Sequence, residues 1–235
     1  MPRVLLFGKT ADPYFRQAVS VAERETDLTV HAGSRDEAFP AAAVSWTGEY
    51  VISYLSPWIL PTSLLKRATK AAINLHPGPP AYPGIGCTNF ALYNDERTYG
   101  ITCHRMAPLV DTGPIIAVRR FPILGQETVL SLTQRCHAAI FVLFGELLAL
   151  IAVGEPLPAA GETWTRRPYR RAELDALCRV TLDMPDDEVR RRIRATTYPN
   201  MPGPFVEIDG ERHPIADLGD LERIRASTAR VRPRR

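Results

Sequence analysis

The chain has 235 residues, of which 45% are hydrophobic and 23% charged, a composition typical of a folded protein rather than a disordered one. Its net charge is +3, yet six arginines and no acid lie from Arg223 onward. Because these arginines contribute six positive charges, the remainder carries −3, and we expect no nucleic-acid partner. Residues 223–235 are expected to be a solvated, frayed terminus.

The cysteine pattern and the apolar segments indicate where the protein works. Its four cysteines form no paired motif, and a chain of this length needs no disulfide, so we expect reduced thiols and a cytoplasmic protein. The apolar run 4–7 is too short for a signal sequence. The run 138–153 contains Glu146 and is shorter than the ~20 residues that span a bilayer, so no membrane partner is expected.

Strand and helix patterns alternate over the first 160 residues. Short apolar segments predict strands at 4–7, 28–31, 50–55, 71–76, 100–106 and 115–121. Spacing and capping residues predict helices at 11–25, 62–68, 87–95 and 128–153, the last with Thr128 as its N-cap. This alternation predicts an α/β fold, with an open, mostly parallel twisted sheet that carries helices on both faces in the Rossmann-like manner.

The composition becomes polar and basic after residue 160. A charged helix is expected at 186–195, and a hairpin at 206–213 with Asp209 and Gly210 in its turn. The sequence therefore predicts a larger domain over residues 1–160. A small α+β region over residues 161–222 and the basic terminus from 223 to 235 would follow it.

Two polar residues near the end of the fourth predicted strand are the first candidates for chemistry. Asn74 and His76 are two positions apart, so they share one face, and Pro77 ends the strand at the edge where parallel sheets bind ligands. An amide and an imidazole there could donate hydrogen bonds to one developing oxyanion. Asp111 follows the next strand and would favour the charged form of His76 if the two strands are neighbours.

Other interpretations of the same residues are open. His76 could be only a hydrogen-bonded structural residue, and the loop 76–86 only a rigid connection. His76, His104 and Asp111 could also form the zinc site of a metal-dependent hydrolase, although neither histidine belongs to a short ligand motif and Asn74 would have no role. A binding module without activity is the third interpretation.

A combination of motifs favours a group-transfer enzyme. In chain order they are Asn74-x-His76, the proline- and glycine-rich loop to Gly86, Gly100-Ile-Thr102-x-His104, and Asp111-Thr-Gly113. Together they resemble the signature of the folate-dependent formyltransferase superfamily over about residues 1–155. The stretches 82–93 and 202–205 are most similar to the branch that N-formylates amino sugars carried on nucleotides.

That resemblance implies a mechanism and a cofactor. A formyl group would pass from 10-formyltetrahydrofolate directly to an amine, with no metal, and the 5-formyl analogue would bind without reacting. Asn74 and His76 would stabilise the oxyanion on the formyl carbon. Asp111 would keep His76 charged and help a water relay the proton from the amine. Thr102 and His104 would have supporting roles.

The resemblance also implies binding residues and partners. Folate contacts are expected from Leu55, Trp58, Ile59, Leu60, Leu109, Val110 and Thr112. Substrate contacts are expected from Lys9, Thr10, Pro77, Tyr82, Gly84 and Gly86. The expected acceptor is a nucleotide-linked 4-amino-4,6-dideoxyhexose, the alternative being a non-sugar amine such as hydroxyornithine. We expect a homodimer through the C-terminal region, because this branch often forms one. The remaining histidines, His31, His137 and His213, are expected to be structural or exposed.

Overall fold

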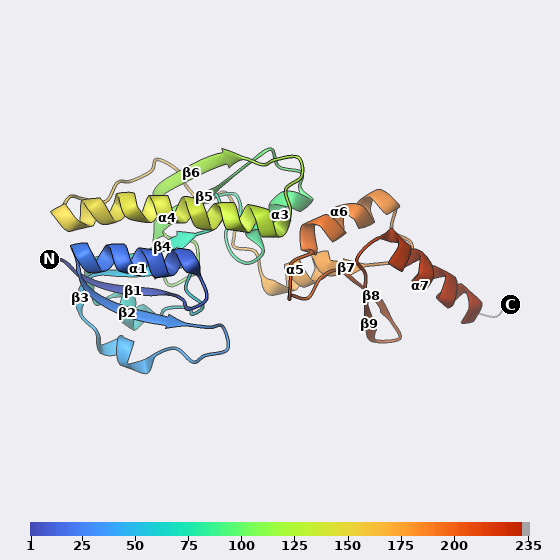
Figure 1. Cartoon of the computed structure of the whole chain (residues 1–235), viewed down its shortest axis with the longest axis horizontal. Coiled ribbons are helices and arrows are strands. Elements are labelled where there is room, and N and C mark those ends of the chain that lie inside the picture. The colour runs from blue at the N-terminus through green and yellow to red at the C-terminus, as the bar shows by residue number, and fades with distance from the viewer. Residues whose placement is uncertain (232–235) are drawn as a thin grey trace. The chain divides into compact units, whose positions relative to one another are not determined.

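The computed structural model describes residues 1–231, which divide into two units (Figure 1). Unit 1 consists of Met1–Gly84, Thr98–Pro122 and Gln134–Pro168. Unit 2 consists of Ile85–Arg97, Ile123–Thr133 and the chain from Tyr169 onward. Each unit is therefore assembled from separate stretches of the sequence.

Unit 1 is built on a six-stranded sheet with the order β2-β1-β3-β4-β5-β6. The strands are β1 (Arg3–Lys9), β2 (Asp27–Gly33), β3 (Gly48–Tyr54), β4 (Ala68–His76), β5 (Thr98–Arg105) and β6 (Ile115–Pro122). The first four strands pair in parallel, whereas β5 runs antiparallel to both β4 and β6. Five of the six strands therefore run in one direction, which confirms the predicted mostly parallel sheet.

Helices cover both faces of this sheet. On one face lie α1 (Pro13–Glu25) and α4 (Val129–Val153), which run side by side in Figure 1. The buried ring of Tyr54 anchors them, since its centroid lies 5.8 Å from that of Phe15 and 5.5 Å from that of Phe144. On the other face, the 3-10 helix η1 (Ala41–Ser45) and the short α2 (Thr62–Leu65) contribute to a separate apolar cluster around Phe7 and Leu64.

The long helix α4 is apolar along most of its 25 residues. By length and composition, it is the one helix among residues 1–231 that could cross a membrane. Within unit 1, however, it buries Ile140, Leu143 and Leu147 almost completely. That buried side is what a helix covering an α/β sheet requires. Its predicted N-cap is confirmed, because the Thr128 hydroxyl accepts a hydrogen bond from the backbone N–H of Ser131 at 3.1 Å.

Unit 2 is smaller and mixes helices with a three-stranded sheet. Its elements are α3 (Cys87–Tyr93), α5 (Arg171–Cys178), β7 (Arg179–Val180), α6 (Asp186–Thr196), β8 (Phe205–Ile208), β9 (Glu211–Pro214) and α7 (Leu218–Val231), with the sheet order β7-β8-β9. The predicted hairpin is β8–β9. Its turn residues Asp209 and Gly210 have φ values of 50° and 84°, the left-handed conformation that two-residue hairpin turns require.

The structure differs from the predicted domain division at α3. The sequence predicts contiguous domains with a boundary at residue 160, but α3 belongs to unit 2 and residues 161–168 belong to unit 1. Long-range hydrogen bonds explain the first difference. Asn89 donates to the carbonyl of Ala195 at 2.7 Å, and the Tyr93 hydroxyl donates to Glu188 at 2.8 Å.

Residues 223–231, which the sequence predicts to be part of a frayed terminus, continue α7 in the structure. Leu221 is fully buried in the apolar cluster of unit 2, so the helix gains packing that its charge pattern does not reveal. Arg225 adds hydrogen bonds at 2.8 Å to the carbonyls of Leu182 and Met184. Residues 232–235 lie outside the described part of the chain.

Candidate functional site

Four polar side chains gather on one face of the sheet where β4 meets β5. Asn74 is paired across the strands with His104, and His76 with Thr102. Because alternate residues of a strand share a face, all four side chains lie on the face opposite Tyr54, α1 and α4. The Thr102 hydroxyl donates to the carbonyl of Gly78 at 2.8 Å, which holds the start of the loop after β4.

Asp111 reaches this cluster from the loop between β5 and β6. Its φ of 48° is unusual for a residue other than glycine, and such strain is often kept at functional sites. Two residues later, Gly113 lies so close to the carbonyl of Arg105 that a Cβ would stand 1.9 Å from that oxygen. The Asp111-Thr-Gly113 motif therefore has a local steric reason, because only glycine lets the loop turn this tightly.

The Asp111 carboxylate contacts every candidate catalytic side chain. Its Oδ2 lies 3.2 Å from His76 Nδ1, and its Oδ1 lies 3.2 Å from His104 Nε2 and 3.3 Å from Asn74 Nδ2. The backbone N–H of Gly84 also donates to Oδ2 at 2.8 Å. The structure thus brings the three predicted catalytic residues together. It also places His104, for which only a supporting role is expected, in direct contact with Asp111.

The two histidines have different hydrogen-bond partners. Both ring nitrogens of His76 face acceptors, Nδ1 the carboxylate of Asp111 and Nε2 the carbonyl of Tyr82 at 2.8 Å, so a doubly protonated ring satisfies both. His104 differs. Its Nδ1 donates to the carbonyl of Arg105 at 2.9 Å, and its Nε2 faces two groups, the Asn74 amide donor at 3.1 Å and Asp111 Oδ1 at 3.2 Å.

The charge on Asp111 is fixed by its neighbours. Burial raises the pKa of the Asp111 carboxyl, but His76, His104 and the N–H of Gly84 outweigh burial and hold that pKa well below its usual range. The carboxyl is therefore ionised at neutral pH. A buried carboxylate beside an imidazolium is stable only with such complete hydrogen bonding.

A metal site finds little support in this geometry. Among residues 1–231, no group of three or more His, Cys, Asp or Glu side chains could hold a metal ion. Both nitrogens of His76 are engaged by oxygen acceptors, and His104 Nε2 already contacts Asn74 and Asp111. The hydrolase interpretation, which needs His76, His104 and Asp111 as free ligands, therefore lacks its donor set.

The candidate folate residues lie on two loops of unit 1. Ile59 is 79% exposed and Leu109 is 71% exposed, and Val110 is also exposed. Leu55 has a strained φ of 52° at the end of β3, and the Trp58 indole N–H donates to the carbonyl of Glu37 at 2.8 Å. Leu60 is buried in the apolar cluster, and the exposed Thr112 donates to the carbonyl of Leu109 at 2.8 Å.

The candidate substrate residues separate into three groups. Tyr82 and Gly84 belong to the loop after Pro77, and their backbone groups contact His76 and Asp111 directly. Lys9 is the last residue of β1 and Thr10 follows it, and β3 separates β1 from β4 in the sheet. Gly86 belongs to unit 2, where its φ of 74° places it at the start of α3.

One residue beside the cluster was not predicted. The Trp164 ring lies edge-on to the rings of His76 and His104, with centroid distances of 5.8 Å and 5.1 Å. Its indole N–H donates to the carbonyl of Gly113 at 2.8 Å. Trp164 lies beyond the predicted domain boundary, in a polar stretch without a recognisable motif, so only the three-dimensional structure reveals it.

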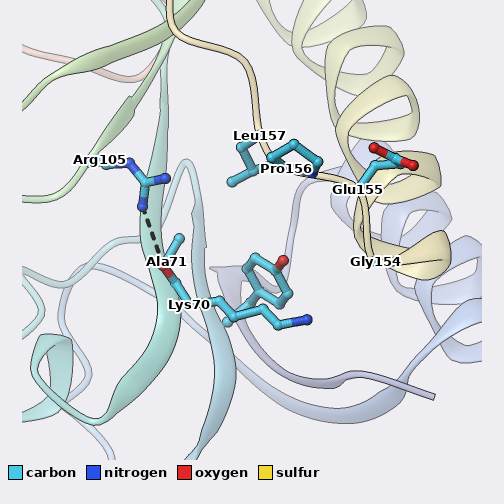
Figure 2. A pocket seen from close by; sticks show the side chains of 8 residues that line it. Lys70, Ala71, Arg105, Gly154, Glu155, Pro156 and Leu157 are labelled. Atoms are coloured by element: carbon cyan, nitrogen blue, oxygen red, sulfur yellow. Dashed lines mark hydrogen bonds between the residues drawn. The ribbon is translucent and has the colours of Figure 1, made fainter.

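A separate cavity of about 260 Å³ lies near the beginning of β3 and β4 (Figure 2). It is lined by Tyr50, Lys70, Ala71, Arg105, Gly154, Glu155, Pro156 and Leu157, none of which was a candidate. The Arg105 guanidinium donates to the carbonyl of Lys70, as Figure 2 shows, and the Lys70 ammonium is paired with Glu49 at 2.9 Å. Both cationic side chains that line the cavity are therefore engaged by protein oxygens.

Comparison with known proteins gives matching results. The formyl transferase family model matches residues 8–143. GDP-perosamine N-formyltransferase of Brucella melitensis biotype 1 is 28% identical over 197 residues, which cover 83% of this chain and 74% of that protein.

Solved structures agree on the fold. A sugar N-formyltransferase from Shewanella sp FDAARGOS_354 superposes with a TM-score of 0.72 and 22% identity, covering 92% of this chain and 96% of that one. The N-formyltransferase from Helicobacter canadensis, solved with folinic acid and dTDP-3-aminofucose, gives a TM-score of 0.69 at 15% identity, covering 90% and 86%. At these identities the two likenesses establish the fold alone.

Proposed function

The chain belongs to the formyl transferase family, since the family model matches more than half of the chain, and we propose that its acceptor is the amino group of a nucleotide-linked amino sugar. The formyl donor in this proposal is 10-formyltetrahydrofolate, and the products are the N-formylated sugar and tetrahydrofolate. The observation that carries the proposal is the contact of Asp111 with His76, His104 and Asn74.

The cluster is suited to stabilising a negatively charged tetrahedral state. As the amine attacks the formyl carbon, the formyl oxygen gains charge, and the His76 ring and the Asn74 amide, on the same face of β4, are donors that could stabilise it. In the resting protein the His76 Nε2–H donates to the carbonyl of Tyr82. The formyl oxygen would compete for that donor, and such bonds commonly tighten only once substrate is bound.

The proton of the amine needs an acceptor near the same point. Asp111 is ionised and buried, so it can orient a water that takes the proton from the attacking nitrogen while His76 stays charged. The nitrogen of the folate that leaves as the carbon–nitrogen bond breaks would then receive a proton. Amine, formyl donor and products therefore balance without a metal or a covalent enzyme intermediate.

The loops beside the cluster fit a folate. Ile59 and Leu109 expose apolar side chains, and the strained Leu55 follows directly on β3. A flat heteroaromatic ring needs such apolar contacts together with backbone hydrogen bonds. The Helicobacter canadensis structure contains folinic acid, which supports the same class of donor here.

The acceptor class is supported by the relatives. The Brucella melitensis relative is a GDP-perosamine N-formyltransferase, and the Helicobacter canadensis structure contains dTDP-3-aminofucose. We therefore favour a nucleotide-linked amino sugar over a hydroxyornithine-like amine. The four free cysteines, all buried, and the soluble substrates support a cytoplasmic location. A homodimer through the C-terminal region remains part of the proposal.

The experiment that tests the proposal is a substrate screen with purified protein. A panel of GDP-, dTDP- and UDP-linked amino sugars, and hydroxyornithine beside them, is incubated with 10-formyltetrahydrofolate, and products are analysed by mass spectrometry. We expect one or a few nucleotide sugars to gain a formyl group, with no gain when 5-formyltetrahydrofolate replaces the donor. Formylation of hydroxyornithine with no sugar product would overturn the proposed acceptor.

A further inference from the structure

A short segment after α4 joins the two loops that carry the candidate catalytic residues. We call residues 160–165 the strap. The backbone N–H of Ala160 donates to the carbonyl of Ile115 at 3.1 Å, and that of Thr165 donates to the carbonyl of Pro80 at 3.2 Å. The strap is thus tied both to the beginning of β6, after the Asp111 loop, and to the loop that follows His76.

Trp164 is the residue of the strap that contacts the candidate catalytic residues. Its N–H holds the carbonyl of Gly113, two residues after Asp111. Its ring meets the ring of His76 at 73° and that of His104 at 85°, both edge-on arrangements that aromatic rings favour. One side chain therefore fixes the loop of Asp111 and contacts both of its histidine partners.

From this arrangement we infer that Trp164 is a positioning residue, which holds the His76–Asp111 pair in register and keeps bulk water from it. The reason is electrostatic. The attraction between an imidazolium and a carboxylate weakens strongly as water enters, because the effective dielectric constant rises. An indole against both histidine rings excludes that water. As a role in catalysis, this inference rests on the proposed formyl transfer.

The first test separates positioning from binding. Trp164→Leu removes both the ring edge and the N–H donor. We expect kcat to fall roughly 10- to 100-fold with little change in KM for either substrate, because small misplacements of reacting groups cost about this much. The alkaline limb of the kcat profile should move to lower pH, since a hydrated carboxylate favours the charged His76 ring less.

Two further variants show whether the effect of Trp164→Leu is specific to this position. Trp164→Phe keeps an aromatic edge without the N–H donor, so it should restore the wild-type pH profile, whereas kcat should recover only in part because the hydrogen bond to Gly113 is still missing. Trp46→Leu is the matched control, because it removes a half-buried indole from the same unit near Gly48, and it should leave both unchanged. An unaltered pH profile in Trp164→Leu, or the same loss in Trp46→Leu, would overturn the inference.

A second measurement does not depend on activity. The amide of Gly84 donates to Asp111 Oδ2, so its hydrogen exchange reports whether the carboxylate is held. We expect Trp164→Leu to speed exchange at Gly84 at least tenfold while Leu6 in the centre of β1 stays protected. If the wild type transfers no formyl group but Gly84 responds in this way, the proposed function fails and the positioning role stands. If transfer occurs and Gly84 does not respond, the positioning role alone fails.

Discussion

Two aspartate–histidine pairs, each with a buried carboxylate, lie on opposite faces of the same sheet. In one, Asp111 Oδ2 is 3.2 Å from His76 Nδ1, and in the other, Asp12 Oδ2 is 3.2 Å from His137 Nδ1. The atoms and the distance are the same. Only the first pair has Asn74 beside it, so the two pairs form a natural comparison between a candidate catalytic pair and a structural one.

The partners of each carboxylate account for the difference. Asp12 is the N-cap of α1, and its Oδ1 accepts from the backbone N–H groups of Tyr14 and Phe15 at 2.9 Å and 3.4 Å. The side chain of its partner His137 is 22% exposed, on α4. The Asp12 pair therefore joins two helices and presents no set of converging donors.

The pKa of both carboxyls is lowered, for different reasons. For Asp12, burial raises the pKa, but the hydrogen bond and charge of His137 and the two helix amides lower it more. For Asp111, burial is opposed by two histidines that are themselves buried. A shifted pKa thus does not distinguish function from structure. The convergence of donors around the carboxylate does.

The change expected to have the largest effect is His76→Asn. It removes the charged donor, so kcat should fall by about 1000-fold or more at every pH, more than the loss of one oxyanion donor costs. The matched change His137→Asn should leave kcat and its pH profile as in the wild type. Steady-state kinetics between pH 6 and pH 9 checks both. Activity that survives in His76→Asn would transfer its role to another residue.

Asn74→Ala comes next. Loss of this amide should lower kcat by roughly 100- to 1000-fold, the usual cost of removing one oxyanion donor. Folate affinity should change little, because the amide acts on charge that develops only in the transition state. Titration with 5-formyltetrahydrofolate measures that affinity. A much weaker affinity together with a normal kcat would contradict the assigned role.

Asp111→Asn should have a smaller effect that depends on pH. The carboxylate favours the protonated His76 ring, so without it the alkaline limb of kcat should move to lower pH, with a loss of about 100-fold near neutrality. The matched change Asp12→Asn should leave the profile in place. If both variants or neither shift the limb, the contrast between the two pairs is wrong.

The sequence revealed the side chains of this site better than its backbone. Asn74 and His76 were predictable because strand alternation and Pro77 determine their face and position. The contacts from the Tyr82 carbonyl and the Gly84 N–H were not, since every residue carries these backbone groups and no residue type marks them.

The fold was predictable where the pattern is local. Alternating elements gave the sheet and its helices, but nothing local shows that β5 runs antiparallel to β4, which lets Asp111 reach Asn74 through a hairpin loop. The position of α3 in unit 2 and the contacts of Trp164 depend equally on distant partners. Long-range pairing of this kind leaves no periodic signal in a single sequence.

Acid stability offers a further way to compare the two carboxylates. The native pKa of Asp111 lies below its unfolded value, so the native state binds fewer protons than the unfolded state. The stability that this difference contributes is present above about pH 4 and is lost as the pH falls further. The free energy of unfolding of the wild type, measured with urea, should therefore fall between pH 7 and pH 3. Asp111→Asn should make that free energy depend less on pH. Asp12→Asn should flatten this pH dependence less, because Asp12 faces one histidine whereas Asp111 faces two. Equal slopes in wild type and Asp111→Asn would show that Asp111 does not carry this linkage.

The smallest expected effect tests the structural pair itself. Asp12→Ala removes the N-cap of α1 and should cost about 1 kcal/mol, which lowers Tm by about 2–4 °C in a protein of this size. Asp12→Asn keeps an acceptor for Tyr14 and Phe15, so it should recover most of that loss. Neither variant should alter kcat, because this carboxylate acts on a helix end and a neighbouring helix, on the face away from Asn74. A kcat that falls together with Tm in Asp12→Ala, and recovers in Asp12→Asn, would mean that the start of α1 helps to shape the site, and the two faces of the sheet would then share one function.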